Sequence, residues 1–89
     1  MKRQYLEVTF RRGKPFAAYL YLPRKVGVKT ARTEDCGRGL LIDFDESNTP
    51  IGIEITAPNA VTIADVNALL TAVGIDSLPA EDLAPLRAA

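Results

Sequence analysis

The sequence predicts an α+β fold: an antiparallel β-meander of about five strands, with one C-terminal helix packed on one face. Within residues 5–55, several segments alternate apolar and polar residues with a period of two, which is typical of strands that bury one face. Residues 62–74 instead repeat apolar residues at helical spacing. We therefore expect residues 1–75 to form a single α+β domain, and residues 76–89 to form a C-terminal tail or a short helix.

Residues 5–22 predict the first hairpin. Aromatic and aliphatic residues alternate with other residues on both sides of Gly13, which can adopt the positive φ that a tight hairpin turn requires. A turn centred on Gly13 would place Leu6 opposite Leu20, and Phe10 opposite Phe16.

Residues 26–55 predict three further strands. We expect the third strand over residues 26–33, a turn at residues 36–39, and the last two strands over residues 40–44 and 51–55. When the last two strands pair, their apolar side chains share one face, as a buried sheet face requires. In this register Leu40 faces Ile55, Ile42 faces Ile53 and Phe44 faces Ile51.

A short helix is predicted from Thr62 to Gly74. Thr62 is a good N-cap, Asp65 suits the positive end of the helix dipole, and Gly74 is typical of a helix C-terminus. One apolar stripe runs along the helix and must be buried, and we expect it to dock on the apolar face of the second hairpin. The stripe consists of Ile63, Val66, Leu69, Leu70 and Val73.

Composition excludes several chemistries. The chain has 89 residues, of which 47% are apolar and 25% charged, as in a small globular domain. It contains no histidine, which excludes Ser/His/Asp and Cys/His catalysis and nearly all zinc sites. Cys36 lies near Glu34 and Asp35, whose charges oppose the low pKa of a nucleophilic thiol. We assign no catalytic residue and no cofactor.

The sequence also predicts a cytoplasmic protein. No apolar run approaches the ~20 residues that a membrane-spanning helix needs. The N-terminal residues carry charge without the apolar segment of a signal peptide. Cys36 is the single cysteine, so an internal disulfide cannot form and a reducing compartment is favoured. We expect no association with a membrane.

Charge is distributed unevenly along the chain. Residues 1–32 contain nine basic residues and one acid, and residues 33–89 contain two basic residues and ten acids. This asymmetry can indicate an anionic partner, or attraction between the two halves within a chain or across a dimer. The predicted first hairpin would place its basic residues at two separate ends. That separation argues against nucleic-acid binding through the basic half, which is kept as an alternative function.

The acidic segment between the last two strands is the best candidate for a metal site. Asp43 and Glu54 would be diagonal neighbours on one sheet face, and Asp45 would continue that face at its end. Calcium and magnesium prefer such oxygen ligands. The simpler interpretation is that Asp, Ser and Asn side chains cap the turn. A divalent-metal site or a carboxylate enzyme using Asp43, Asp45 and Glu54 is therefore an alternative function.

Two short motifs in this segment resemble a small bacterial family, domain of unknown function 2283. They are Asp43-Phe44-Asp45, matching the family's D-x-D, and Gly52-Ile53-Glu54-Ile55, matching its G-I-E-I. Residues 8–22 are also similar to its first hairpin, so the resemblance spans residues 8–57. The resemblance implies no established activity. Some members are suspected of neutralising small ribonuclease-like toxins, which implies an antitoxin-like or regulatory role.

The leading functional hypothesis is a non-enzymatic protein-interaction or dimerisation module. The chain combines a well-specified core with an absence of catalytic arrangements. A domain of this size has a thin core, and self-association is a common way to bury more surface. We therefore expect a homodimer, with a further protein partner as the second expectation.

Overall fold

The computed structural model describes residues 4–87. An antiparallel sheet comes first, and two short α-helices and two 3₁₀-helices follow it. In chain order the elements are β1 (Tyr5–Arg11), β2 (Lys14–Tyr21), β3 (Arg32–Gly37), β4 (Leu40–Phe44), β5 (Pro50–Ile55), η1 (Pro58–Ala60), α1 (Ile63–Ala72), α2 (Ala80–Leu83) and η2 (Ala84–Arg87). The predicted α+β class with a five-stranded antiparallel sheet is confirmed.

The strand order differs from that of a meander. The sheet runs β1-β2-β5-β4-β3, so β5 takes the place beside β2 where a meander would put β3. The predicted meander is therefore wrong. β5 carries three buried isoleucines, Ile51, Ile53 and Ile55, whereas every residue of β3 is exposed. Because a central strand has neighbours on both sides, the most apolar strand is placed there and the polar strand forms an edge.

The third strand begins later in the chain than predicted. We expected it over residues 26–33, but β3 starts at Arg32. Gly27 has a φ of 82°, and the backbone N–H of Val28 donates to the carbonyl oxygen of Lys25 over 3.3 Å. The chain therefore turns at Gly27, and this turn breaks the extended conformation that the alternation of residues suggested.

The first hairpin contains one irregularity in its register. Leu6 pairs with Leu20, as predicted. The register shifts between Thr9 and Phe10, so that Phe10 pairs with Pro15. The predicted pairing of Phe10 with Phe16 is therefore wrong. A β-bulge leaves one residue of the bulged strand without a partner, and here that residue is Phe16.

The second hairpin follows the predicted register except at its turn. The apolar side chains share one face, and their burial confirms the prediction. The register shifts between Asp43 and Phe44, which moves one pairing by a residue. Leu40 pairs with Ile55 and Ile42 with Ile53, as predicted, whereas Phe44 pairs with Pro50 and not with Ile51.

Both outer hairpins are closed by an Arg-Gly pair. Arg12 and Gly13 have φ values of 54° and 78°, and Arg38 and Gly39 have values of 55° and 75°. Two consecutive residues with positive φ define the type I′ turn, which matches the twist of the paired strands. The turn predicted at residues 36–39 is thus narrowed to Arg38 and Gly39, and Gly37 ends β3.

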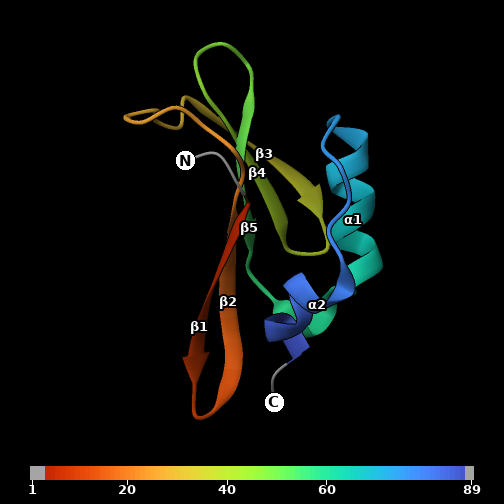
Figure 1. The fold of residues 1–89 in the computed structure, drawn as a ribbon. Helices are drawn as coiled ribbons and strands as arrows, with labels where there is room; N and C mark the ends of the chain where they lie inside the picture. Colours follow the sequence, from red (N-terminus) through yellow and green to blue (C-terminus); the bar gives the residue numbers. More distant parts are fainter. Residues whose placement is uncertain (1–3, 88–89) are drawn as a thin grey trace.

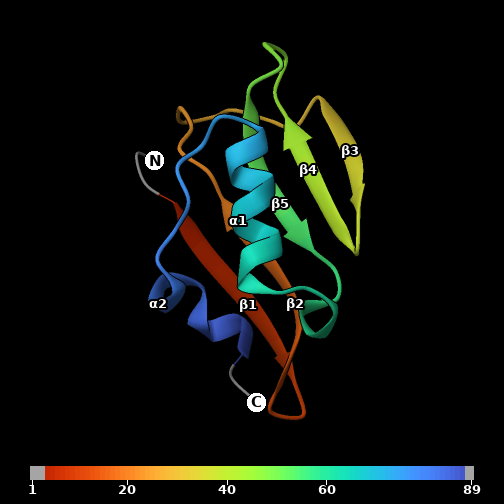
Figure 2. The same cartoon turned by 90° about the vertical axis from the view of Figure 1, so that its right-hand side faces the viewer.

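The helices cover one face of the sheet, and the opposite face is uncovered (Figures 1 and 2). Strand alternation supplies the apolar side chains of the covered face, and the helices close over them. The buried core consists of Ala18, Leu20, Leu22, Leu40, Ile42, Ile53, Ile55, Val61, Val66, Leu70, Leu83 and Leu86.

Helix α1 begins and ends as the sequence predicts. The Thr62 hydroxyl accepts a hydrogen bond from the Asp65 N–H over 3.0 Å, and the Asp65 carboxylate accepts one from the Thr62 N–H over 2.9 Å. This reciprocal capping box satisfies two N–H groups that would otherwise lack partners. Val66 and Leu70 of the apolar stripe are fully buried against the sheet.

The chain after α1 returns to the same core. The Asn67 side chain donates to the Leu78 carbonyl oxygen over 2.9 Å and accepts from the Leu78 N–H over 2.7 Å. This double hydrogen bond ties the connecting segment to α1. Leu83 of α2 and Leu86 of η2 are buried at 0% and 1% exposure. Among residues 4–87, no helix is both long enough and apolar enough to cross a membrane.

Leu83→Ala should lower the free energy of unfolding by about 2–5 kcal/mol, because it removes a fully buried side chain and leaves a cavity. Glu81→Ala, an exposed change in the same helix, should alter it by less than about 0.5 kcal/mol. Urea unfolding followed by circular dichroism measures both. Equal effects of the two substitutions would show that α2 is not part of the cooperative core.

Candidate functional site

The uncovered face of the sheet carries three tyrosines. Tyr19 and Tyr21 lie on β2, and both point away from the helices because Leu20 between them points into the core. Tyr5 of β1 pairs with Tyr21 and therefore points to the same face. The ring centroids of Tyr5 and Tyr21 are 5.7 Å apart, and those of Tyr19 and Tyr21 are 4.7 Å apart. We call this surface the tyrosine face; it consists of Tyr5, Glu7, Tyr19, Tyr21, Leu41 and Glu54.

Tyr19 lies across the sheet and reaches β4. Its hydroxyl donates a hydrogen bond to Oδ2 of Asp43 over 2.7 Å, and the Thr33 hydroxyl donates to Oδ1 of the same carboxylate over 2.6 Å. The ring passes over Gly52 of β5, where an added Cβ would lie 1.9 Å from the Tyr19 hydroxyl oxygen. Gly52 is therefore required by the position of Tyr19, since any side chain there would overlap the ring.

This environment raises the pKa of Tyr19 to about 12. Burial is the main cause, since it disfavours the charged phenolate, and the hydrogen bond to the Asp43 carboxylate is the second. Tyr19 is therefore a fixed neutral donor across the neutral pH range, and it is unsuited to act as a general base there.

Tyr21 is held by a hydrogen bond at its hydroxyl and by a cation at its ring. The Tyr21 hydroxyl donates to Oε1 of Glu7 over 3.4 Å, and the guanidinium carbon of Arg24 lies 5.2 Å from the Tyr21 ring centroid. Arg24 also donates a hydrogen bond to the carbonyl oxygen of Ile51. These contacts restrain the Tyr21 ring at the end of β2, so the aromatic part of the tyrosine face is ordered before any partner binds.

The acidic turn after β4 is stabilised by its own side chains. Oδ1 of Asp45 accepts hydrogen bonds from the backbone N–H groups of Ser47 and Thr49, over 2.8 and 3.0 Å. Asn48 adopts a φ of 66°, a conformation that asparagine tolerates better than most residues. The interpretation of this segment as a capped turn is therefore well supported by its geometry.

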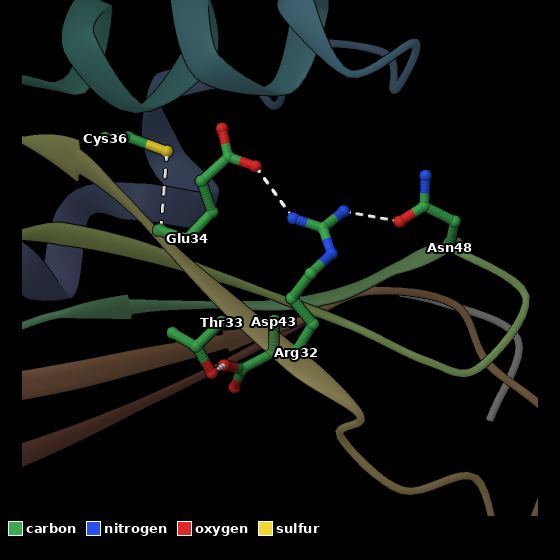
Figure 3. A network of polar contacts seen from close by, with 6 residues as sticks. All are labelled: Arg32, Thr33, Glu34, Cys36, Asp43 and Asn48. Carbon is green, nitrogen blue, oxygen red and sulfur yellow. Dashed lines mark hydrogen bonds and ion pairs between the residues drawn. The ribbon is translucent and has the colours of Figure 1, made fainter.

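The edge strand β3 places a polar cluster beside the apolar face (Figure 3). The Arg32 guanidinium lies 4.0 Å from the Phe44 ring centroid, donates to Oε2 of Glu34 over 2.9 Å, and donates to Oδ1 of Asn48. Charged side chains on an exposed edge discourage pairing with another strand. This cluster therefore protects the edge and screens Phe44.

Cys36 follows on the same strand and donates a weak hydrogen bond to the Glu34 carbonyl oxygen over 3.7 Å (Figure 3). Burial, and then the negative charges of Glu34 and Asp35, raise the pKa of the Cys36 thiol. A raised pKa reduces the fraction of thiolate, which is the nucleophilic form. Cys36 is therefore an exposed thiol with a reduced tendency to act as a nucleophile.

The three predicted metal-binding residues lie in different surroundings. Asp43 and Glu54 are diagonal neighbours on the uncovered face, as predicted, since Asp43 pairs with Gly52 and Leu41 with Glu54. Asp43 is occupied by Tyr19 and Thr33, as described above, and Glu54 is exposed. Within residues 4–87, no group of three or more His, Cys, Asp or Glu side chains is arranged to hold a metal ion. The metal site stays a prediction from the sequence.

A family model described as "Protein of unknown function (DUF2283)" matches residues 17–57. These residues therefore match the family that the two sequence motifs resemble. The DUF2283 segment covers most of β2 and all of β3, β4 and β5. The match begins at Ala17, whereas the resemblance noted in the sequence begins at residue 8, and β1 lies outside the match. No curated protein and no solved structure matches the chain.

Sequence reasoning missed the partnership of Tyr19 with Gly52. It used Gly52 only as the first residue of the G-I-E-I motif. The available signal was the glycine itself, because a glycine inside a strand often marks the close approach of another group. What could not be read from the sequence is which side chain approaches, since that depends on β5 lying beside β2.

Gly52→Ala should destabilise the protein by roughly 1–3 kcal/mol, because the new Cβ overlaps Tyr19. In a Tyr19→Ala background the same change should cost far less, giving a coupling of at least ~0.5 kcal/mol in a double-mutant cycle. Urea unfolding of the four proteins measures it. An equal cost in both backgrounds would contradict the proposed overlap.

Stability should fall at alkaline pH because Tyr19 ionises. The folded state holds the phenol proton more tightly, so this contribution is complete below pH 10 and is lost as the pH rises toward 12. Tyr19→Phe removes the titrating group and should lose less stability over that range than the unmodified protein. The comparison uses urea unfolding at a series of pH values. Parallel pH profiles would contradict the assignment.

Proposed function

We propose that this chain is a non-enzymatic protein-interaction module, and that the tyrosine face is its binding surface. The observation that carries the proposal is an ordered tyrosine array on a sheet face that no helix covers. Tyr5 is 56% exposed, and Tyr19 and Tyr21 are half-buried with their rings in mutual contact. Tyrosine is enriched in interfaces because its ring is apolar and its hydroxyl can form hydrogen bonds.

The order of the array favours tight binding. A side chain that is mobile in the free protein loses conformational entropy when a partner immobilises it, which costs roughly 0.5–1.5 kcal/mol for a long flexible chain. Tyr19 and Tyr21 are already held by Asp43, Glu7 and Arg24. Much of that entropic cost is therefore met in folding, as in other pre-organised binding surfaces.

Charge indicates the chemistry of the partner. Glu7 and Glu54 are exposed on the tyrosine face, and Asp43 is the diagonal neighbour of Glu54. The Arg24 guanidinium contacts the Tyr21 ring of this array. The surface is therefore acidic, and a partner with basic residues around an apolar centre would complement it. A small basic enzyme held inactive by such a face would make this module antitoxin-like, and a basic regulator would make it regulatory.

The homodimer predicted from the small size of the domain would be a different occupant of the same face. Two copies stacked on their tyrosine faces would bring together acids of like charge, which disfavours pairing unless each Arg24 reaches a carboxylate of the other copy. We therefore propose a basic protein partner first. A cytoplasmic setting is part of this proposal.

Tyr5→Ser and Glu54→Arg should each abolish capture of the partner by the tagged protein from bacterial lysate, or weaken it by roughly 30-fold where the residue is a hot spot. Asp76→Arg makes the same charge change as Glu54→Arg away from the face and should retain the partner. A retained protein with a basic surface, lost from both face variants, supports the proposal. Retention by all variants, or capture of none, contradicts it.

Light scattering on the same proteins distinguishes a second copy of the chain from a basic protein partner as the occupant of the tyrosine face. A dimer that both face variants convert to a monomer would assign the face to a second copy of the chain and overturn the basic-partner proposal. A monomer in every variant, together with the selective capture described above, would support it.

A further inference from the structure

The turn of the β1–β2 hairpin projects beyond the helices and the rest of the sheet (Figures 1 and 2). Two aromatic and three basic residues lie at this end of the hairpin. We call the group the hairpin tip; it consists of Phe10, Arg11, Arg12, Lys14 and Phe16. It lies outside the DUF2283 segment, and the function proposed for the tyrosine face does not use it.

The two phenylalanines of the hairpin tip are poorly buried. Phe10 is 48% exposed and Phe16 is 51% exposed, and neither belongs to the core or to the apolar residues packed against it. The bulge between the pairs Thr9–Ala17 and Phe10–Pro15 leaves Phe16 without a cross-strand partner. Exposed aromatic rings are costly in water, so two of them on one projecting hairpin suggest a binding role.

Cations lie close to the Phe16 ring. The Arg11 guanidinium carbon lies 4.6 Å from the Phe16 ring centroid. Arg11, Arg12, Lys14, Pro15 and Phe16 line a shallow hollow of about 670 Å³. Within residues 4–87, the salt bridges join Arg32 to Glu34 and Arg38 to Asp65, so none of them neutralises the hairpin tip. The tip therefore presents uncompensated positive charge around an aromatic surface.

We propose that the hairpin tip binds single-stranded nucleic acid, with Phe10 and Phe16 stacking on bases and Arg11, Arg12 and Lys14 contacting phosphates. Stacking on aromatic side chains combined with a basic surface is the general mode of single-strand recognition without sequence preference. Bases in a duplex are already stacked on each other, so the exposed rings favour a single strand. The basic residues of the first hairpin are divided between its two ends, which argued against a single extended nucleic-acid groove. The three cations at the turn end are enough to contact a short strand.

The geometry disfavours a membrane as the partner. The leading residues of the tip are Arg12 and Gly13, which form the turn, and the phenylalanines lie behind them on the strands. Insertion of the rings into a bilayer would first bury the Arg12 guanidinium, which is strongly unfavourable. Contact with a nucleic-acid strand requires no such burial, because the phosphates remain at the surface with the cations.

The proposal is tested with a fluorescein-labelled oligothymidine of ~12 nucleotides, a length that covers a typical site. Fluorescence anisotropy at about 20 mM salt, where phosphate contacts are strongest, should give saturable binding. Three phosphate contacts predict a slope of about −2 in a plot of log K against log salt concentration. Absence of binding at low salt would overturn the proposal.

Variants separate the two contributions. Arg12→Asn removes a cation while keeping the turn, since asparagine tolerates positive φ, and should make the slope shallower by about 0.7. Phe16→Ser should weaken binding about 5-fold or more at every salt concentration. Lys25→Gln makes a comparable charge change in the loop after β2 and should have a small effect. Circular dichroism confirms that each variant is folded.

Two results would contradict the proposal even if binding is seen. An effect of Lys25→Gln as large as that of Arg12→Asn would show that binding is spread over the basic half and not centred on the tip. Unchanged binding by Phe16→Ser would exclude stacking on that ring. Binding to phosphatidylserine vesicles with no binding to the oligonucleotide would assign the tip to a membrane surface instead.

Discussion

The contact of Tyr19 with Gly52 and Asp43 is the constraint on which the uncovered half of the structure depends. It joins β2 to β4 across β5, and Thr33 extends the same hydrogen-bonded chain to β3. The opposite face is held by apolar burial under the helices, but this face has no such cover. Hydrogen bonds to a carboxylate are stronger than those between neutral groups, so one acid can hold two hydroxyl groups in place. The tyrosine face is ordered as a consequence.

This contact also explains the family motifs in physical terms. In D-x-D, Asp43 accepts the Tyr19 and Thr33 hydroxyl groups, and Asp45 accepts two backbone N–H groups of the turn. In G-I-E-I, Gly52 gives room to the Tyr19 ring, and the two isoleucines are buried in the core. Each of these residues has a structural task, apart from Glu54, which is exposed. The motifs therefore specify a sheet and leave activity to the surfaces around it.

Local patterns in the sequence predicted much of this structure. Alternation identified both hairpins and most of their register, and Thr62, Asp65 and Gly74 defined α1 correctly, because caps and alternation are local properties. Strand order was not predictable in this way, since it depends on which strand buries the most apolar surface when it lies beside β2. The role of Tyr19 depends on that order, and so it was missed as well. The burial of Leu83 likewise needs the connection between Asn67 and Leu78, which no periodicity reveals.

The uneven charge of the chain acquires a spatial meaning from the fold. Mutual neutralisation of the halves would require ion pairs between the hairpin cations and the later acids, yet the salt bridges among residues 4–87 involve Arg32 and Arg38 and leave the hairpin tip unpaired. The acids of the tyrosine face lie on β1 and β5, and the cations of the tip lie at the turn of the β1–β2 hairpin, so they occupy separate regions of one sheet. Because screening limits electrostatic attraction to roughly 8–10 Å in physiological salt, each region acts on its own surroundings. One small sheet can thus present two binding surfaces of opposite charge.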